Sequence, residues 1–110
     1  MAWKWYGKPM HFIGGNECRF HLATDLGNGY VVSTVGEYQP KNDGVVQTIG
    51  YERKYETMVF ASKGECKCGC GQPGIKPSEL AFEGYNDAKA ATRGHMALCK
   101  EWAKKRGRKK

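Results

Sequence analysis

A stripe of mostly apolar residues near the carboxyl end repeats with the period of an α-helix. Asn86 is a suitable N-cap, and Asp87 places a negative charge where a helix start favours one. The following side chains then recur every three or four positions: Ala88, Ala91, His95, Leu98, Cys99 and Trp102. This spacing puts them on one face, so the sequence predicts an amphipathic helix whose apolar face packs against another element.

The preceding two-thirds of the chain has the pattern of β-strands. Residues 18–23 alternate in polarity, and residues 30–38 are rich in β-branched and aromatic side chains. Between them, Asn28-Gly29 readily adopts positive φ, which predicts a hairpin. Residues 55–61 form a further predicted strand, 45–49 a short one and 39–44 a loop. The predicted fold class is α+β, with about three to five antiparallel strands followed by a C-terminal helix.

The length of 110 residues is that of one domain. We expect a single α+β domain over residues 1–103, with a β-rich part at 12–62 and a second part at 63–103 that contains the helix. Residues 104–110 are expected to form a basic tail. With fifteen glycines, a chain of this size would be stabilised by a cross-link, and a metal ion is one such link.

Cysteine and histidine residues suit a metal site in the second part. Cys66, Cys68 and Cys70 lie on a glycine-rich turn, and His95 and Cys99 share one face of the predicted helix. Thiolates and imidazole are the ligands that tetrahedral zinc prefers. The predicted ligands are Cys66, Cys68, His95 and Cys99, with Cys70 as a substitute in the turn. Four protein ligands leave no open position, which indicates a structural zinc ion that clasps the helix.

Cysteine usage also bears on the compartment. The five cysteines are an odd number, the first residues lack the apolar stretch of a signal peptide, and no long apolar run predicts a membrane span. We therefore expect a reducing cytoplasm, where clustered thiols more often hold a metal than form disulfides. The alternative to zinc is a disulfide from Cys99 to Cys66 or Cys68.

The formal net charge of +7 lies mostly at the carboxyl end, where seven cations from Lys100 onward face only Glu101. The tail itself carries Lys104, Lys105, Arg106, Arg108, Lys109 and Lys110. One interpretation is an electrostatic contact with nucleic acid, because neutralised phosphates release counterions. The other is a solubilising tail that also favours the negative end of the helix dipole.

A second candidate binding segment combines aromatic and basic residues near the amino end. Trp3, Lys4 and Trp5 could stack on bases while contacting phosphates, or could anchor a protein partner. The alternative is a strand whose Trp3 and Trp5 side chains face the core while Lys4 points to water. No small-molecule site is indicated.

A Cys–His enzyme is the alternative function. Cys18 lies near His21 in sequence, and His11 could approach it from another segment. Strand alternation, however, puts Cys18 on one face and His21 on the other. Cys18 is therefore predicted to be a small buried hydrophobic residue, and no catalytic residue is assigned.

Three segments carry a family resemblance: FHLAT at 20–24, VSTVGEY at 32–38 and IGYERKYETMVF at 49–60. They resemble a family of small proteins encoded by tailed bacteriophages and prophages, over about residues 12–60. The resemblance implies an origin and no activity: a phage accessory protein in the cytoplasm of the infected bacterial host. The predicted function is a non-enzymatic, zinc-stabilised binding module whose partner is host nucleic acid, a host protein or a nucleoprotein defence complex. A minor virion component is a further alternative.

Overall fold

The computed structural model describes residues 3–6, 18–39, 41, 44–48, 53–65, 73–76 and 80–105. Within them an antiparallel sheet precedes a C-terminal helix, which confirms the α+β class. The sheet has six strands, more than the three to five expected. The elements are β1 (Lys4–Tyr6), β2 (Cys18–Asp25), β3 (Tyr30–Tyr38), β4 (Tyr55–Glu65), β5 (Pro73–Ile75), β6 (Ala81–Tyr85) and α1 (Ala88–Ala103).

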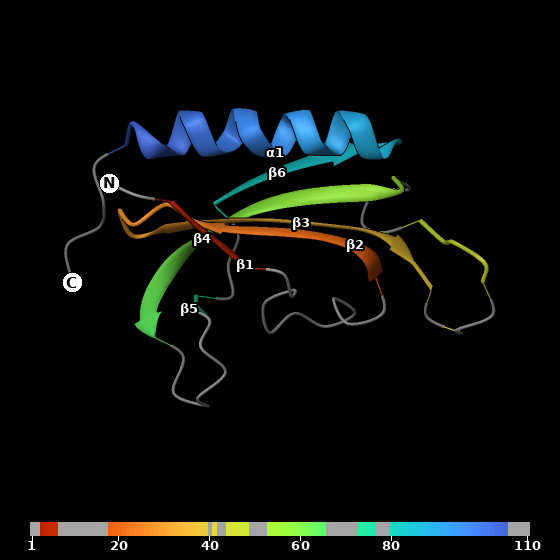
Figure 1. The fold of residues 1–110 in the computed structure, drawn as a ribbon, viewed down its shortest axis with the longest axis horizontal. Helices are drawn as coiled ribbons and strands as arrows, with labels where there is room; N and C mark the ends of the chain where they lie inside the picture. Colours follow the sequence, from red (N-terminus) through yellow and green to blue (C-terminus); the bar gives the residue numbers. More distant parts are fainter. Residues whose placement is uncertain are drawn as a thin grey trace.

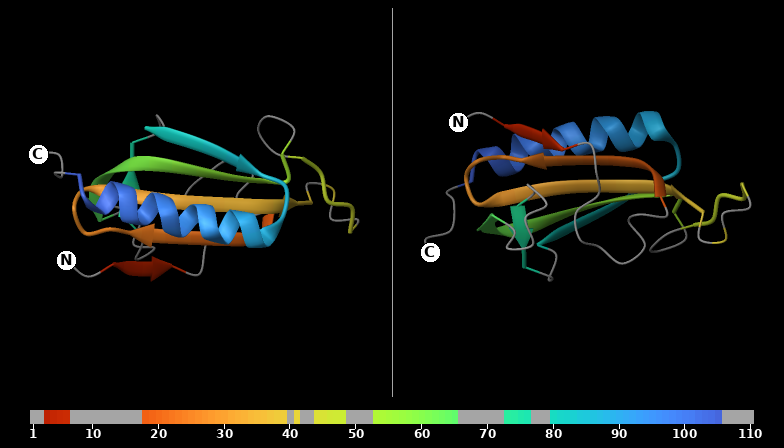
Figure 2. Two further views of the ribbon diagram at one scale, coloured as in Figure 1. Left: turned by 90° about the horizontal axis from the view of Figure 1, so that it is seen from above. Right: turned by 60° about the horizontal axis from the view of Figure 1, so that its bottom comes forward.

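The sheet is built around the long strand β4. Strands β1 to β4 pair in sequence order, and β6 then pairs with the first half of β4. The second half of β4 bends out of the main sheet and pairs with β5 instead (Figure 1). Seen from above, α1 runs along one face of the sheet, between β1 at one edge and β6 at the other (Figure 2).

The hairpin of β2 and β3 is confirmed, and its turn differs in detail from the expectation. The Leu26 amide donates to the Tyr30 carbonyl over 3.0 Å, which closes the turn. Positive φ falls on the two glycines, with φ of 77° at Gly27 and 98° at Gly29. Glycine adopts these angles at no steric cost, so the side chain of Asn28 is free for another task.

Asn28 joins the hairpin turn to the end of α1. Its side-chain nitrogen donates to the carbonyl of Trp102 at 2.9 Å and to that of Lys105 at 3.2 Å. The last carbonyls of a helix have no partner within the helix. The turn therefore stabilises the helix end and fixes its position over the sheet.

The predicted helix is confirmed with one correction at its start. Asp87, and not Asn86, is the N-cap: its backbone is extended and its carboxylate accepts from the Ala90 amide over 2.7 Å. The side chain of residue 87 can reach that amide because it lies three positions ahead. The buried positions of α1 are those of the predicted stripe, namely Ala91, His95, Leu98 and Cys99.

The main core lies between α1 and the sheet. It consists of Leu26, Tyr30, Val32, Val59, Leu98 and Cys99, with Trp3, Ala81, Trp102 and Ala103 packed at its margin. On the opposite face of the sheet, Ala23 and Val31 are buried and Ile75 packs against them. The helix therefore covers one face, and the other face carries a smaller apolar cluster.

Two strands lie where the sequence indicated only a connector. Between the predicted strand at 55–61 and the helix, the sequence predicted only a glycine-rich turn. Instead β4 continues to Glu65, β5 begins at Pro73, and β6 follows. Proline is tolerated as the first residue of a strand, where its missing N–H is not needed. The short strand expected at 45–49 is only an isolated bridge between Gln47 and Tyr38, and Ile49 lies outside the described residues.

Candidate functional site

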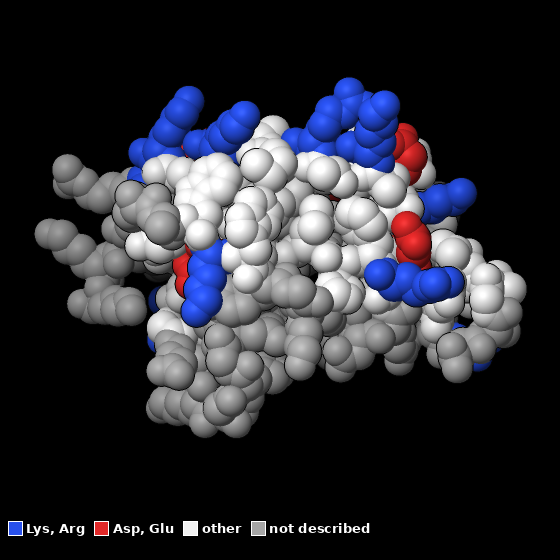
Figure 3. Space-filling model, viewed as in Figure 1, with Lys and Arg blue, Asp and Glu red and all other residues white. Residues whose placement is uncertain are grey.

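Four basic side chains form a row along the outer side of α1. They are Lys89, Arg93, Lys100 and Lys104, and all four are exposed. At about 100° of rotation per residue, they fall within about 60° of one another around the helix axis, opposite the buried stripe. The row extends over about 22 Å at 1.5 Å per residue. We call these four residues the basic face; Figure 3 shows Lys and Arg side chains gathered above the sheet, over α1.

The basic end of the chain divides at the end of α1. Lys104 caps the helix and belongs to the basic face. Lys105 turns away from it, because its ammonium nitrogen lies 4.6 Å from the centre of the Trp102 ring in a cation–π contact. Arg106, Arg108, Lys109 and Lys110 lie outside the described residues, so their predicted role stays a prediction.

Trp3 and Trp5 differ in exposure although they are two residues apart. Trp3 packs at the margin of the core, as the core interpretation expected. Trp5 keeps 52% of its surface exposed, against that interpretation. Its ring centre lies 6.0 Å from that of His95 and 6.4 Å from that of Trp3. Because β1 is a short edge strand beside α1, Trp5 touches the helix without being covered by it (Figure 2).

His95 is the centre of a buried hydrogen-bond network beneath α1. It is fully buried, with Nε2 2.8 Å from the Thr24 hydroxyl and Nδ1 2.7 Å from the Thr34 hydroxyl. The Thr34 hydroxyl is in turn 2.6 Å from that of Thr57. Burial lowers the pKa of His95 to about 4, so the imidazole is neutral at neutral pH. A neutral imidazole donates from one nitrogen and accepts at the other, and the two threonines satisfy both.

Cys99 lies one turn further along the same side of α1. It is fully buried, and burial raises the pKa of its thiol to about 11, with a hydrogen bond to Thr24 acting in the opposite direction. The thiol is therefore neutral in the arrangement seen here. Cys99 and His95 share the face that the sequence predicted for them, and their partners in the structure are threonines of β2 and β3.

The predicted zinc site combines two described residues, His95 and Cys99, with a turn that the structure does not describe. Cys66, Cys68 and Cys70 lie outside the described residues. Over the described ranges, no three His, Cys, Asp or Glu side chains form a group that could hold a metal ion. Zinc coordination by His95 would replace one of its two threonine hydrogen bonds. The zinc site stays a prediction.

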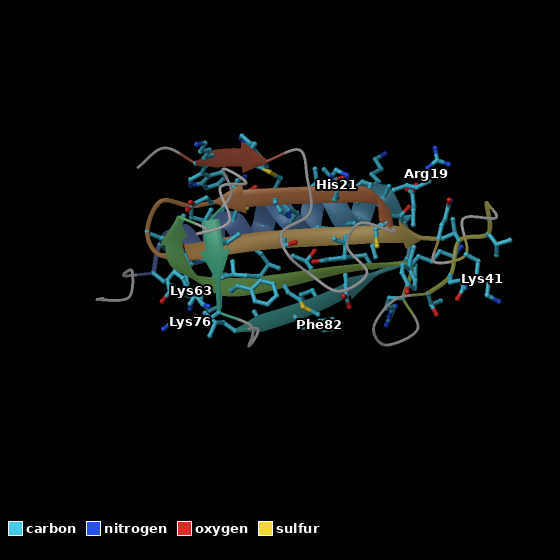
Figure 4. All side chains as sticks on the ribbon, turned by 90° about the horizontal axis from the view of Figure 1, so that it is seen from below. Arg19, His21, Lys41, Lys63, Lys76 and Phe82 are labelled. Atoms are coloured by element: carbon cyan, nitrogen blue, oxygen red, sulfur yellow. The ribbon has the colours of Figure 1, made fainter. Side chains whose placement is uncertain are left out.

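Cys18 and His21 lie on opposite faces of the sheet, as strand alternation predicted. Cys18 is buried on the side of α1, and His21, an odd number of positions away, points to the opposite side (Figure 4). Nδ1 of His21 is buried without a hydrogen-bond partner among the residues that the structure describes. The two side chains cannot act together as nucleophile and base. His11 lies outside the described residues.

Within the described part of the chain, no helix is both long enough and apolar enough to cross a membrane.

Comparison with known proteins finds no matching family model, no matching curated protein and no matching solved structure. The function must therefore be argued from the side chains themselves. The basic face was not among the sequence predictions, which rested on the apolar side of the helix; the spacing of residues 89, 93, 100 and 104 was the signal available.

Proposed function

We propose that the protein binds nucleic acid through the basic face of α1. The observation that carries the proposal is the alignment of Lys89, Arg93, Lys100 and Lys104 on one exposed side of a single helix. A row of cations about 22 Å long matches a repeating line of phosphates, and each contact releases counterions. Arg106, Arg108, Lys109 and Lys110 of the tail stay part of the proposal through their charge alone.

The helix is held in place before any ligand arrives. Asp87 caps its start, Asn28 binds its last carbonyls, and His95 anchors its middle to β2 and β3. A fixed helix presents its cations without first having to be ordered, so less binding energy is lost on association. This favours a role for α1 as a preformed binding element.

A lipid surface fits α1 less well than nucleic acid does. Helices that lie on membranes insert an apolar face between the lipids. The apolar face of α1 is already buried against the sheet, and the large exposed hydrophobic residues within the described ranges are Trp5, Val45, Val46 and Leu80, none of them on α1. The exposed side of the helix offers mainly positive charge. Binding to an acidic protein is the competing outcome of the test below.

The experiment compares two variants that remove the same charge. In the basic-face variant, Lys89, Arg93, Lys100 and Lys104 are all changed to glutamine. In the control variant, glutamine replaces Arg19, Lys41, Lys63 and Lys76, which are exposed elsewhere on the molecule (Figure 4). Each variant loses one arginine and three lysines, so net charge is matched.

Binding of a labelled oligonucleotide is followed by fluorescence anisotropy over a range of salt concentrations. We expect the basic-face variant to bind weakly and the slope of log K against log salt to fall by about 3, the contribution of four phosphate contacts. The control variant should bind nearly as wild type does. Equal losses in both variants would show that net charge alone, and not the basic face, attracts the ligand. Wild-type protein that binds acidic peptides more tightly than nucleic acid would refute the proposal.

Two further parts of the proposal have their own support. A structural zinc ion held by Cys66, Cys68 or Cys70, His95 and Cys99 is supported by the ligand types and by the shared helix face of the last two. Its test is the zinc content of freshly purified, reduced protein, where a value far below one per chain would remove zinc from the proposal.

The phage origin is supported by the motifs between residues 20 and 60, and a pull-down from infected cells tests whether the ligand is a host component.

A further inference from the structure

The two flanks of the basic face differ in charge. Two exposed carboxylates lie toward β6: Glu101 on α1 and Glu83 on β6 itself. Glu101 is on the same flank of α1 as Gly94, and Tyr85 of β6 lies against Gly94. Toward β1, the described residues of β1 and the helix-facing positions of β2 include no carboxylate. A polyanion on the basic face is repelled on the β6 flank and meets no carboxylate among the described residues of the β1 flank. The β1 flank is therefore the favoured side for the rest of the ligand.

Trp5 lies on that favoured flank. It pairs with Thr24 of β2, on the side of the sheet that α1 covers, and 52% of its surface is exposed. The contacts with His95 and Trp3 hold the indole against the helix and leave much of it accessible. Since α1 with its side chains is about 10–12 Å across, the basic face and Trp5 are about one helix diameter apart. One ligand can reach both.

We infer that the ligand of the basic face is a single-stranded nucleic acid and that one of its unpaired bases stacks on Trp5. This inference rests on the proposed function and adds the form of the ligand to it. In a duplex, the flat faces of the bases are covered by their neighbours, and only the base edges are accessible in the grooves. In a single strand those faces are free, and a positively charged surface beside an exposed aromatic ring is the arrangement that binds such strands.

The test uses an oligothymidine strand of about 16 nucleotides and a duplex of the same length. Trp5→Leu keeps an apolar side chain against His95 and Trp3 but removes the aromatic face, and Trp5→Phe keeps an aromatic face. Leu80→Ala is the control, because Leu80 is an exposed apolar residue next to β6, on the other flank. We expect Trp5→Leu to weaken binding of the single strand by about 5- to 140-fold and to leave duplex binding unchanged. Trp5→Phe should restore most of the loss, and Leu80→Ala should have no effect.

A second readout does not depend on a variant. Oligothymidine should quench tryptophan emission of the wild-type protein, because a stacked base contacts the exposed indole directly. Unchanged emission at saturating strand, or equal wild-type affinity for strand and duplex, would overturn the inference. If the basic-face variant loses binding in that case, the proposed function still stands. Failure of the wild-type protein to bind either form would overturn the proposed function itself.

Discussion

The inner and outer faces of α1 use their polar residues in opposite ways. On the inner face, His95 is fully buried and each of its ring nitrogens lies within hydrogen-bond distance of a threonine hydroxyl. On the outer face, Lys89, Arg93, Lys100 and Lys104 are exposed. Buried polar groups affect stability strongly, whereas exposed charges far from such groups affect it little. One helix can therefore be fixed by one side and bind a ligand with the other.

This comparison predicts that the two faces can be changed separately. Replacing His95 by alanine removes one hydrogen-bond partner from each of the Thr24 and Thr34 hydroxyls and opens a cavity under the helix. We expect a loss of about 3–5 kcal/mol in the free energy of unfolding, measured by urea denaturation. Lys100→Ala on the outer face should change it by less than about 0.5 kcal/mol. Equal effects of the two substitutions would contradict the division between the faces.

Acid should weaken the inner face through the same residue. Burial lowers the pKa of His95 from 6.5 to about 4 in the folded protein. Above about pH 6.5 both states are neutral and the full stability is present. As the pH falls from 6.5 to 4, the unfolded chain takes up a proton that the folded chain does not, so stability decreases by about 3 kcal/mol. Below about pH 4 this loss is complete.

The variant His95→Gln isolates this effect, because glutamine can donate and accept hydrogen bonds but does not titrate. Unfolding free energies of wild type and variant are compared between pH 7 and pH 4. Both proteins contain the same carboxylates, so the titration of these groups cancels in the difference. The difference between the two proteins should shrink as the pH falls. A constant difference over this range would show that His95 has the same pKa in the folded and the unfolded protein, as an imidazole exposed to water would.

A smaller effect is expected at the start of the helix, which belongs to neither face. Asp87→Ala removes the acceptor of the Ala90 amide, and such N-cap substitutions cost about 1 kcal/mol. Asn86→Ala is the neighbouring control and should cost less, because Asn86 is not the cap. Thermal unfolding followed by circular dichroism measures both. A larger loss for Asn86→Ala would place the N-cap one residue earlier, as the sequence alone suggested.

The sequence predicted the elements whose pattern is long and regular. The strands around residues 18–23, 30–38 and 55–61 and the helix stripe from Ala88 to Trp102 each repeat over enough positions to identify their period. Strands β5 and β6 are only three and five residues long, and both depend on pairing with β4. A local pattern carries no information on such pairing, so these strands were missed.

The candidate site was predictable in part for the same reason. Spacing placed His95 inward, but its partners Thr24 and Thr34 lie 71 and 61 positions earlier in the chain, beyond any local pattern. Alternation alone could not separate the partly buried Trp3 from the exposed Trp5, since it places both on the same face. The basic face, in contrast, follows from the spacing of its four residues and was predictable from the sequence alone.

The salt dependence of nucleic-acid binding tests the outer face most directly. Anisotropy titrations with a labelled single strand should give a steep decrease of affinity with salt for the wild-type protein, and a slope smaller by about 3 when the four residues of the basic face are changed to glutamine. The matched control at Arg19, Lys41, Lys63 and Lys76 should keep nearly the wild-type slope. An unchanged slope in the basic-face variant would contradict the account, because the ligand would then not lie on α1.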